Sequence, residues 1–458
     1  MNEFLGVAGL LAGLAVLIFL ALRGIDIVFA ALLSALVVIV TNGLPLADTL
    51  IQGFALGPLG TFTFAGKFFL LFVAGSVFGR SMSDSGAAAS IATWLLEKLG
   101  KERVLMVTVI GCALLTYGGV VVFVVIFAMY PLGLQLLRDA DIPKRLFCAA
   151  MALGAGTFTM TALPGTPSIH NVISATALGT DLYAAPLLGL LGAAVMLALG
   201  LWYLEHQRQL AKERGEGFQP GPNDTALQVA ASHQPHPLLA ALPLVIVLAT
   251  ILVPRLIAPE ALGHSGLAVQ LLEFAQGNTA LWTSIALFMG SLTAIGLAPD
   301  LRTRSLDTMG QGTQAAIMPL INTSVVIGFG GVVTLTQGFQ SFVDLAVTSD
   351  GSPLLSIFAS ISLISAITGS ASGGLQIFMQ TLAPGYLALG VEPEVLHRVA
   401  TIAAGGFDSL PHCGAVVAML TITQLTHRQG YKDVAVVTVL IPVVASFAVI
   451  AAAALGLR

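Results

Sequence analysis

The stretch Ala162-Leu163-Pro164-Gly165-Thr166-Pro167-Ser168-Ile169-His170-Asn171 interrupts a long apolar run, 145–180, with two prolines and a glycine. A transmembrane helix needs about 20 mostly apolar residues, so the run is long enough to cross a bilayer if its helix breaks in the middle. Irregular backbone is tolerated at that depth only inside protein or beside a water-filled cavity. The stretch therefore predicts a membrane-spanning helix whose break lies at an internal site.

The composition of the whole chain points to the same class of protein. Apolar residues make up 56% of the 458 residues and charged residues only 9%, whereas a soluble domain carries about a quarter charged residues. The apolar runs are continuous and lack the period-two alternation of a membrane β-barrel. With a net charge of −4 and no long basic run, the chain is not expected to bind nucleic acid. An all-α polytopic membrane protein in a lipid bilayer is predicted.

Hydrophobic runs give the path of the chain through the membrane. Single spans are predicted at 3–22, 27–42, 66–80, 183–204, 237–254, 279–298, 318–336 and 433–455, and broken spans at 145–180 and 398–427. The stretches 104–137 and 353–388 are too long for one span and carry Gly-rich interruptions. Each is predicted to be a re-entrant hairpin, with two full spans as the alternative. The polar segment 205–236 is predicted to be a linker.

The basic residues give this path an orientation. With the N-terminus outside, 15 of the 19 Lys and Arg residues fall on one face, and the other four are Lys67, Arg255, Arg398 and Arg458. Lys and Arg mark the cytoplasmic side of a membrane protein. The linker is therefore expected in the cytoplasm and both termini outside.

The two sides of the linker share four landmarks in the same order, which predicts a first repeat at 1–204 and a second at 237–458. The landmarks are Tyr117-Gly118-Gly119, Pro131-Leu132-Gly133, Arg145 and Leu163-Pro164 in the first half, and Ser372-Gly373-Gly374, Pro384-Gly385, Arg398 and Leu410-Pro411 in the second. Each half is predicted to have about five spans and one hairpin. Because a hairpin leaves the membrane on the side where it entered, the number of crossings is odd and the second repeat is inverted. Inverted repeats with broken segments typically place a transporter's site at the midplane. Chance similarity between Gly-rich apolar stretches is the alternative.

Four breaks are predicted to meet at that midplane. They are the hairpin tips Thr116–Gly119 and Gly369–Gly374 and the helix breaks Leu163–Ser168 and Asp408–Gly414. New helices are expected at Pro167, with Thr166 as the N-cap, and at Leu410, capped by Asp408 or Ser409. Helix N-termini offer free N–H groups and partial positive charge, which suit an anion, and we expect no basic residue near the breaks. The predicted substrate-binding residues are Thr116, Gly118, Gly119, Gly165, Thr166, Ser168, Asn171, Ser370, Ser372, Gly373 and Ser409.

Three titratable residues at the breaks are predicted to couple proton movement to transport. Asp408 lies inside a span, where a carboxylate is expensive unless it is paired or protonated. His412 follows one helical turn later and can face it, and His170 has a comparable place in the first half. Histidine titrates near neutral pH. The alternatives are a plain helix cap for Asp408 and hydrogen-bonded interior histidines.

At these breaks the chain resembles the gluconate permease (GntP) family of the ion-transporter superfamily. The resemblance rests on 162–171 and on Gly405-Gly406-Phe407-Asp408-Ser409-Leu410-Pro411-His412-Cys413-Gly414, and the second motif is most similar to members known as D-β-hydroxybutyrate permeases. It implies secondary uptake of an organic hydroxy acid, usually with protons, across a bacterial inner membrane. It also implies scaffold and transport domains, a homodimer and an elevator motion.

These observations favour a proton symporter for a small hydroxy-monocarboxylate such as 3-hydroxybutyrate. Few polar side chains line the breaks, so a polyol chain would leave several hydroxyls unsatisfied, each costing about 1–3 kcal/mol. Gluconate, another sugar acid or a citrate-type anion is the alternative substrate, and sodium the alternative coupling ion. A channel is less consistent with two inverted halves that enclose a site lined by helix breaks. An enzyme would need a nucleophile or metal set that the sequence lacks, and no cofactor is expected.

Overall fold

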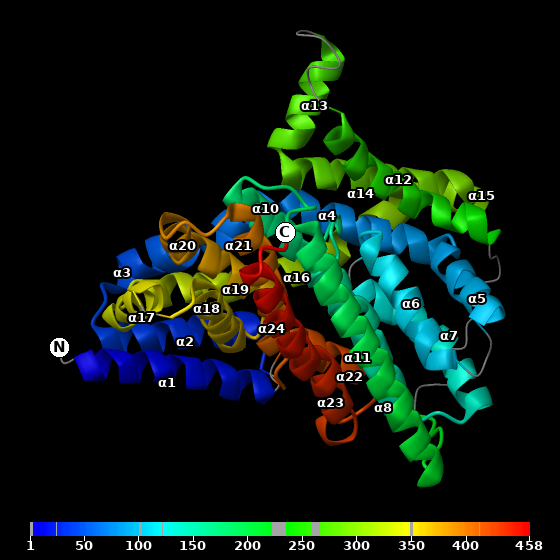
Figure 1. The fold of residues 1–458 in the computed structure, drawn as a ribbon, viewed down its shortest axis with the longest axis horizontal. Helices are drawn as coiled ribbons and strands as arrows, with labels where there is room; N and C mark the ends of the chain where they lie inside the picture. Colours follow the sequence, from blue (N-terminus) through cyan, green and yellow to red (C-terminus); the bar gives the residue numbers. More distant parts are fainter. Residues whose placement is uncertain are drawn as a thin grey trace.

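The computed structural model describes residues 3–23, 25–99, 103–120, 122–221, 235–257, 266–348, 351–411 and 413–458. Every regular element in these ranges is a helix (Figure 1). Among the described residues, six segments are long and apolar enough to cross a membrane: α4 (Thr61–Asp84), α11 (Pro186–Glu213), α12 (Pro237–Leu256), α14 (Thr279–Leu297), α16 (Ser305–Thr334) and the continuous run of α23 (His427–Ala435), η4 (Val436–Leu440) and α24 (Ile441–Ala454). The predicted all-α polytopic class is confirmed.

Two predicted spans match their helices to the residue. They are α1 (Glu3–Leu22) and α2 (Ile27–Asn42), which lie side by side near the N-terminus in Figure 1. The Asp26 carboxylate accepts the backbone N–H of Val28 at 2.9 Å and caps the start of α2. Gly43, with a φ of +63°, ends the helix in the left-handed conformation, which glycine adopts without strain.

Several of the long helices pack on one another in series. α2 and α4 both pack on α16, α14 packs on α4, and α12 packs on α14. α16 begins at Ser305, well before the span predicted at 318–336, and Pro319 lies inside it. α11 continues to Glu213, so the first part of the predicted linker 205–236 is helical. Polar end turns that project from a membrane helix carry no hydropathy signal, which explains both extensions.

Each half of the chain contains a pair of shorter helices joined by a tight tip. In the first half these are α6 (Val104–Tyr117) and α7 (Val122–Ala140), and in the second α18 (Pro353–Thr368) and α19 (Ala371–Thr381). At about 1.5 Å per residue, α6 is roughly 21 Å long and α18 roughly 24 Å. Both are shorter than a hydrocarbon core of about 30 Å, but the predicted span α2 is as long as α18, so helix length does not separate re-entrant hairpins from full spans.

Each half also contains a broken helix, and these pack in the middle of the molecule. The first consists of α8 (Lys144–Gly156), α9 (Phe158–Thr161) and α10 (Ile169–Leu178), and the second of α21 (Pro393–Phe407) and α22 (Gly414–Ile422). α10 contacts α21, and α8 contacts α23. The broken helices of one half therefore pack against helices of the other. The remaining short helices are α3 (Leu46–Asp48), η1 (Thr49–Ala55), α5 (Ala87–Leu99), α13 (Leu267–Gly277), α15 (Pro299–Arg302), α17 (Gln337–Thr348) and α20 (Ala383–Ala388).

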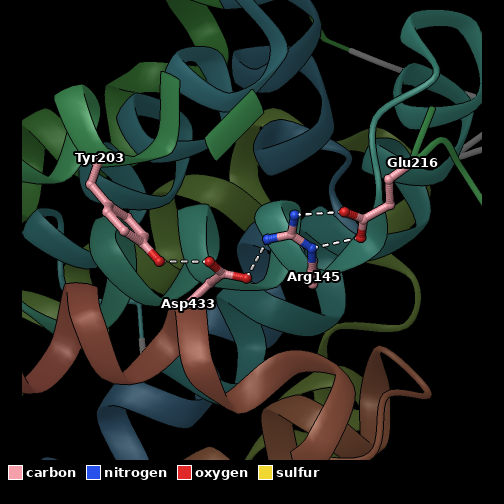
Figure 2. A network of polar contacts seen from close by, with 4 residues as sticks. All are labelled: Arg145, Tyr203, Glu216 and Asp433. Carbon is pink, nitrogen blue, oxygen red and sulfur yellow. Dashed lines mark hydrogen bonds and ion pairs between the residues drawn. The ribbon is translucent and has the colours of Figure 1, made fainter. Parts of the chain in front are cut away.

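A hydrogen-bonded ion network joins the two halves near the start of α8 (Figure 2). Arg145 donates from Nε and Nη2 to the two carboxylate oxygens of Glu216, at 2.7 and 2.8 Å. Its Nη1 donates to Oδ2 of Asp433 at 2.6 Å, and the Tyr203 hydroxyl donates to Oδ1 of Asp433 at 2.7 Å. Asp433 is buried. Because Glu216 follows α11 and Asp433 belongs to α23, one arginine ties three segments together.

Candidate functional site

The first hairpin tip lies against the first helix break. The Tyr117 hydroxyl donates to the Pro164 carbonyl at 2.9 Å. Gly119 has a φ of +101°, and a Cβ placed there would lie 3.1 Å from Pro167 and 2.3 Å from Leu287. Glycine is required at this position both by the backbone conformation and by the close packing. The predicted meeting of these two breaks is present in the structure.

Gly165 and Ser168 set the geometry of the first break. Gly165 has a φ of +81° and donates its N–H to the Leu182 carbonyl at 2.8 Å. Ser168 accepts the Asn171 N–H at 3.3 Å and donates its own hydroxyl to the Met160 carbonyl at 2.6 Å. The predicted N-cap at Thr166 is therefore wrong, because α10 begins at Ile169 with Ser168 as its cap. The second bond, to Met160, is a tertiary contact that fixes Ser168 in this role.

The second hairpin tip is built from glycine and serine. Gly369, with a φ of +58°, ends α18. The Ser370 hydroxyl accepts the Gly373 N–H at 3.2 Å and caps α19, and it lies 3.2 Å from the Ser372 hydroxyl. A Cβ on Gly374 would lie 2.3 Å from Oγ of Ser365. This tip therefore presents a tightly packed, capped helix N-terminus.

Asp408 connects the second helix break to that hairpin tip. The Ser409 hydroxyl donates to Oδ1 of Asp408 at 3.0 Å, and the backbone N–H of Ala371 acts electrostatically on the same carboxylate. Since Ala371 is the first residue of α19, the Asp408 carboxylate lies on the N-terminus of that helix. The expectation that Asp408 or Ser409 caps a helix at Leu410 is wrong, because α22 begins only at Gly414. His412, the predicted partner of Asp408, lies outside the described residues.

Two backbone carbonyls of this second break are bonded by side chains of α23. The Tyr431 hydroxyl donates to the Ser409 carbonyl at 3.1 Å. The Nε2 atom of His427 lies 2.9 Å from the Pro411 carbonyl oxygen. These bonds satisfy carbonyl groups that the broken helix leaves unpaired and fix the loop that carries Asp408.

Four of the seven buried polar side-chain atoms without a hydrogen-bond partner in the described residues lie at or beside the breaks, and the other three belong to Ser34, Thr61 and Asn322. The four are Oγ1 of Thr116, Oγ1 of Thr166, Nδ1 of His170 and Oγ of Ser365. The first three lie at the first hairpin tip and first helix break, and Ser365 packs against the second tip. An unsatisfied buried polar group costs about 1–3 kcal/mol, so such a cluster is typical of a site that binds a polar ligand.

Asn171, predicted to bind substrate, is instead engaged with the protein. Its amide nitrogen donates to the carbonyls of Thr166 and Leu182, at 3.1 and 3.0 Å. Its amide oxygen lies 2.8 Å from Nε2 of His397 and accepts from Arg398 at 3.3 Å. These contacts use both donors and both lone pairs of the amide. Asn171 therefore holds the break in place in this conformation.

Arg398 is the residue near the site that sequence reasoning missed. We expected it at the membrane face and expected no basic residue near the breaks, but its side chain is fully buried and donates to the Ala162 carbonyl at 3.1 Å. Hydropathy placed Arg398 at the end of a span because it bounds an apolar run. The side chain turns inward, where carbonyls at the end of a broken helix are free to accept. The sequence offered one signal for this role: Arg145 and Arg398 occupy corresponding positions in the two predicted repeats.

Gly-tipped helix pairs packed against broken helices are typical of membrane transporters. The chain belongs to the GntP family of permeases, because the family model described as GntP family permease matches residues 5–455. This confirms the family resemblance and identifies a multi-pass membrane transporter, not an enzyme.

Individual relatives agree with that assignment. An uncharacterized transporter of Bacillus subtilis (strain 168), YxjC, is 37% identical over 471 residues, covering 96% of this chain and 97% of that protein. A high-affinity gluconate transporter of Escherichia coli (strain K12) is 26% identical, covering 80% of this chain and 81% of the other. The crystal structure of the Alcanivorax borkumensis YdaH transporter aligns over 86% of this chain and 88% of its own, with a TM-score of 0.56 and 14% identity. This last likeness concerns the fold alone.

Proposed function

We propose that this permease takes up a small hydroxy-monocarboxylate together with protons, with the anion at the helix breaks and Asp408 as the proton-carrying group. The observation that carries the proposal is the place of Asp408 on the N-terminus of α19. A helix N-terminus attracts an anion. In this conformation the side chain of Asp408 occupies that position itself.

This placement links proton binding to anion binding. Two carboxylates at one buried site repel each other strongly, so one of them takes up a proton. A substrate carboxylate that approaches the tip of the second hairpin therefore favours protonation of Asp408. By thermodynamic reciprocity, protonation of Asp408 favours substrate binding. Cotransport of the anion and a proton follows if both move through the membrane together.

Two substrates are supported about equally. The second break motif favours 3-hydroxybutyrate, and the short apolar flank at Phe407 and Leu410 suits a methyl-ended chain. The similarity to an Escherichia coli high-affinity gluconate transporter favours gluconate. The unpartnered groups of Thr116, Thr166 and His170 offer hydrogen bonds to hydroxyls of either molecule. Competition by excess butyrate, gluconate and citrate against labelled 3-hydroxybutyrate uptake separates the two.

The proposal is tested by uptake into proteoliposomes with and without an inward pH gradient. D408N should lose at least tenfold in pH-driven accumulation while it retains exchange of internal for external substrate, because only net transport requires the proton. D84N is the matched control, since Asp84 pairs with Arg80 away from the breaks. Accumulation by D408N at the wild-type level would contradict proton carriage by Asp408. Accumulation that depends on a sodium gradient and not on pH would show that sodium is the coupling ion.

The inverted repeat, the homodimer and the elevator motion remain predictions. The pairing of one hairpin and one broken helix in each half supports the first of them.

A further inference from the structure

Arg398 is a buried cation behind the first helix break, and the transport scheme above gives it no role. We propose that Arg398 is the positive charge of the anion site: it positions the break at Leu163–Ser168 and attracts a carboxylate to the N-terminus of α10 without touching it. This inference rests on the proposed function in one respect, namely that the breaks bind an anion. It makes Arg398 a positioning residue and an electrostatic determinant of affinity.

The guanidinium holds both flanks of the first break. Nη1 donates to the Ala162 carbonyl at 3.1 Å, just before the break. Nε and Nη2 donate to the Ala184 carbonyl at 3.0 and 2.8 Å, after α10. A Cβ on Gly189 of α11 would lie 3.1 Å from Nε and 2.5 Å from the Ala162 carbonyl oxygen. Glycine at 189 therefore makes room for the guanidinium at the point where it grips the backbone.

A short chain of hydrogen bonds leads from Arg398 to the cap of α10. Nη1 donates to the side-chain oxygen of Asn171 at 3.3 Å. The backbone N–H of Asn171 donates in turn to the Ser168 hydroxyl at 3.3 Å. Thr166 and His170, which flank this cap, carry buried polar atoms without a partner. The charge thus lies one side chain away from a helix N-terminus that has free hydrogen-bonding groups.

Within the described residues, Arg398 donates hydrogen bonds only to neutral carbonyl and amide oxygens. The neighbouring His397 also has neutral partners, Thr180 and Asn171. Asp181 acts on Arg398 electrostatically, but it is exposed and accepts the Tyr183 N–H at 2.7 Å. Glu394 accepts the Ala185 N–H at 3.2 Å.

This arrangement leaves the positive charge largely effective inside the protein. Solvent screens the exposed carboxylate of Asp181, whereas a buried charge acts over longer distances because the interior polarises weakly. A charged group inside a membrane protein is also expensive to retain and is typical of a functional site. An anion at the first break would therefore be stabilised by Arg398 through space.

A charged-reagent experiment measures this potential without a substrate. Ser168 is partly buried, so S168C is introduced into a background in which Cys112, Cys148 and Cys413 are replaced. The readout is the ratio of the reaction rates with anionic and cationic methanethiosulfonates of similar size. R398Q should lower this ratio at least threefold, R398K should keep it, and D181N should change it little, because solvent screens that carboxylate. R458Q is the control that should leave it unchanged, because Arg458 pairs with Glu392 at the surface.

Uptake kinetics provide the second readout. R398Q should raise the KM for 3-hydroxybutyrate or gluconate more than it lowers Vmax, and R398K should recover most of the affinity. If the ratio is unchanged in R398Q, or if R398K and R398Q lose affinity equally, Arg398 is only a brace and the inference is wrong. If R398Q does not fold, R398K decides: a ratio kept at the wild-type level supports the inference, and a ratio lowered at least threefold overturns it, because lysine keeps the positive charge. Failure of the wild-type protein to take up either anion would refute the proposed function, while the reagent ratio would still decide the role of Arg398.

Discussion

Two arginines, one from each half of the chain, reach into the opposite half and bind quite different partners there. Arg145 of α8 binds the carboxylates of Glu216 and Asp433 (Figure 2). Arg398 of α21 binds the amide oxygen of Asn171 and backbone carbonyls of the first half. Both tie a helix to a distant segment. Only Arg145 has its charge neutralised by the groups that it binds.

The difference separates two uses of a buried cation. A guanidinium between two carboxylates mainly holds the two segments together, because the opposite charges cancel at a distance. A guanidinium that binds neutral oxygens retains its positive potential, and its hydrogen bonds still fix the surrounding backbone. The comparison predicts that damage at Arg145 will mainly affect stability, whereas damage at Arg398 will affect both stability and the affinity for an anion.

The largest stability effect is expected for D433A. Asp433 is 1% exposed, and its removal would leave Arg145 with one partner and Tyr203 with none. Breaking a buried ion pair by removing one partner costs about 3–5 kcal/mol. Thermal unfolding in detergent should show a strongly lowered midpoint for D433A. The fraction of D433A that inserts into the membrane should have a KM close to that of the wild type.

A double variant is the control for this prediction. R145M/D433L replaces both charged groups by apolar ones, which is often nearly neutral for a buried pair. It should recover part of the stability lost in D433A. Equal losses in the single and double variants would mean that Arg145 and Asp433 do not act as a pair.

A smaller loss is expected for N171A in the other region. This change removes the amide that serves Arg398, His397 and the carbonyls of Thr166 and Leu182. Arg398 keeps its bonds to the Ala162 and Ala184 carbonyls, and the Leu182 carbonyl keeps the Gly165 N–H. The cost of about 1–3 kcal/mol for each unsatisfied buried group therefore falls mainly on two groups, and bound water can satisfy some of it. N171A should therefore unfold at a lower temperature than the wild type but above D433A. An unfolding midpoint below that of D433A would reverse the ranking of the two regions.

Sequence patterns sufficed to locate most of the apolar helices and the breaks between them. Long apolar runs bounded by Asp26 and Gly43 locate α2 to the residue, because local chemistry alone decides such ends. The Pro and Gly residues at 163–168 correctly predict an interruption in the helix. The first residue of the new helix was not predictable, since the Ser168 hydroxyl is held by Met160 from an earlier helix.

The polar interior was predicted less well for a similar reason. Asp408 was correctly located beside a break, but its contact with Ala371 joins residues from two separate elements. Arg398 was placed at the membrane surface because hydropathy treats every arginine as a boundary. Its actual partners are carbonyls of Ala162 and Ala184, whose availability depends on the tertiary fold. One-dimensional patterns locate the breaks and the titratable groups, and the folded chain decides which of them meet.

The smallest effect is expected for E216Q, and it depends on pH. Hydrogen bonds from Arg145 hold the pKa of the Glu216 carboxyl below its ordinary value of 4.5. A carboxyl whose pKa is lowered by folding stabilises the protein above its unfolded pKa, and this contribution disappears as the pH falls through the folded value. Because the Glu216 side chain is 37% exposed, solvent screening limits the contribution to less than about 1 kcal/mol. The difference in unfolding midpoint between wild type and E216Q should therefore be small and constant from pH 6 to 8, and it should vanish as the pH falls below about 4.5. A difference that grows on acidification would show that the Glu216 carboxylate does not neutralise Arg145. Asp433 would then be the one effective ionic partner of Arg145, and the contrast with Arg398 would be weaker.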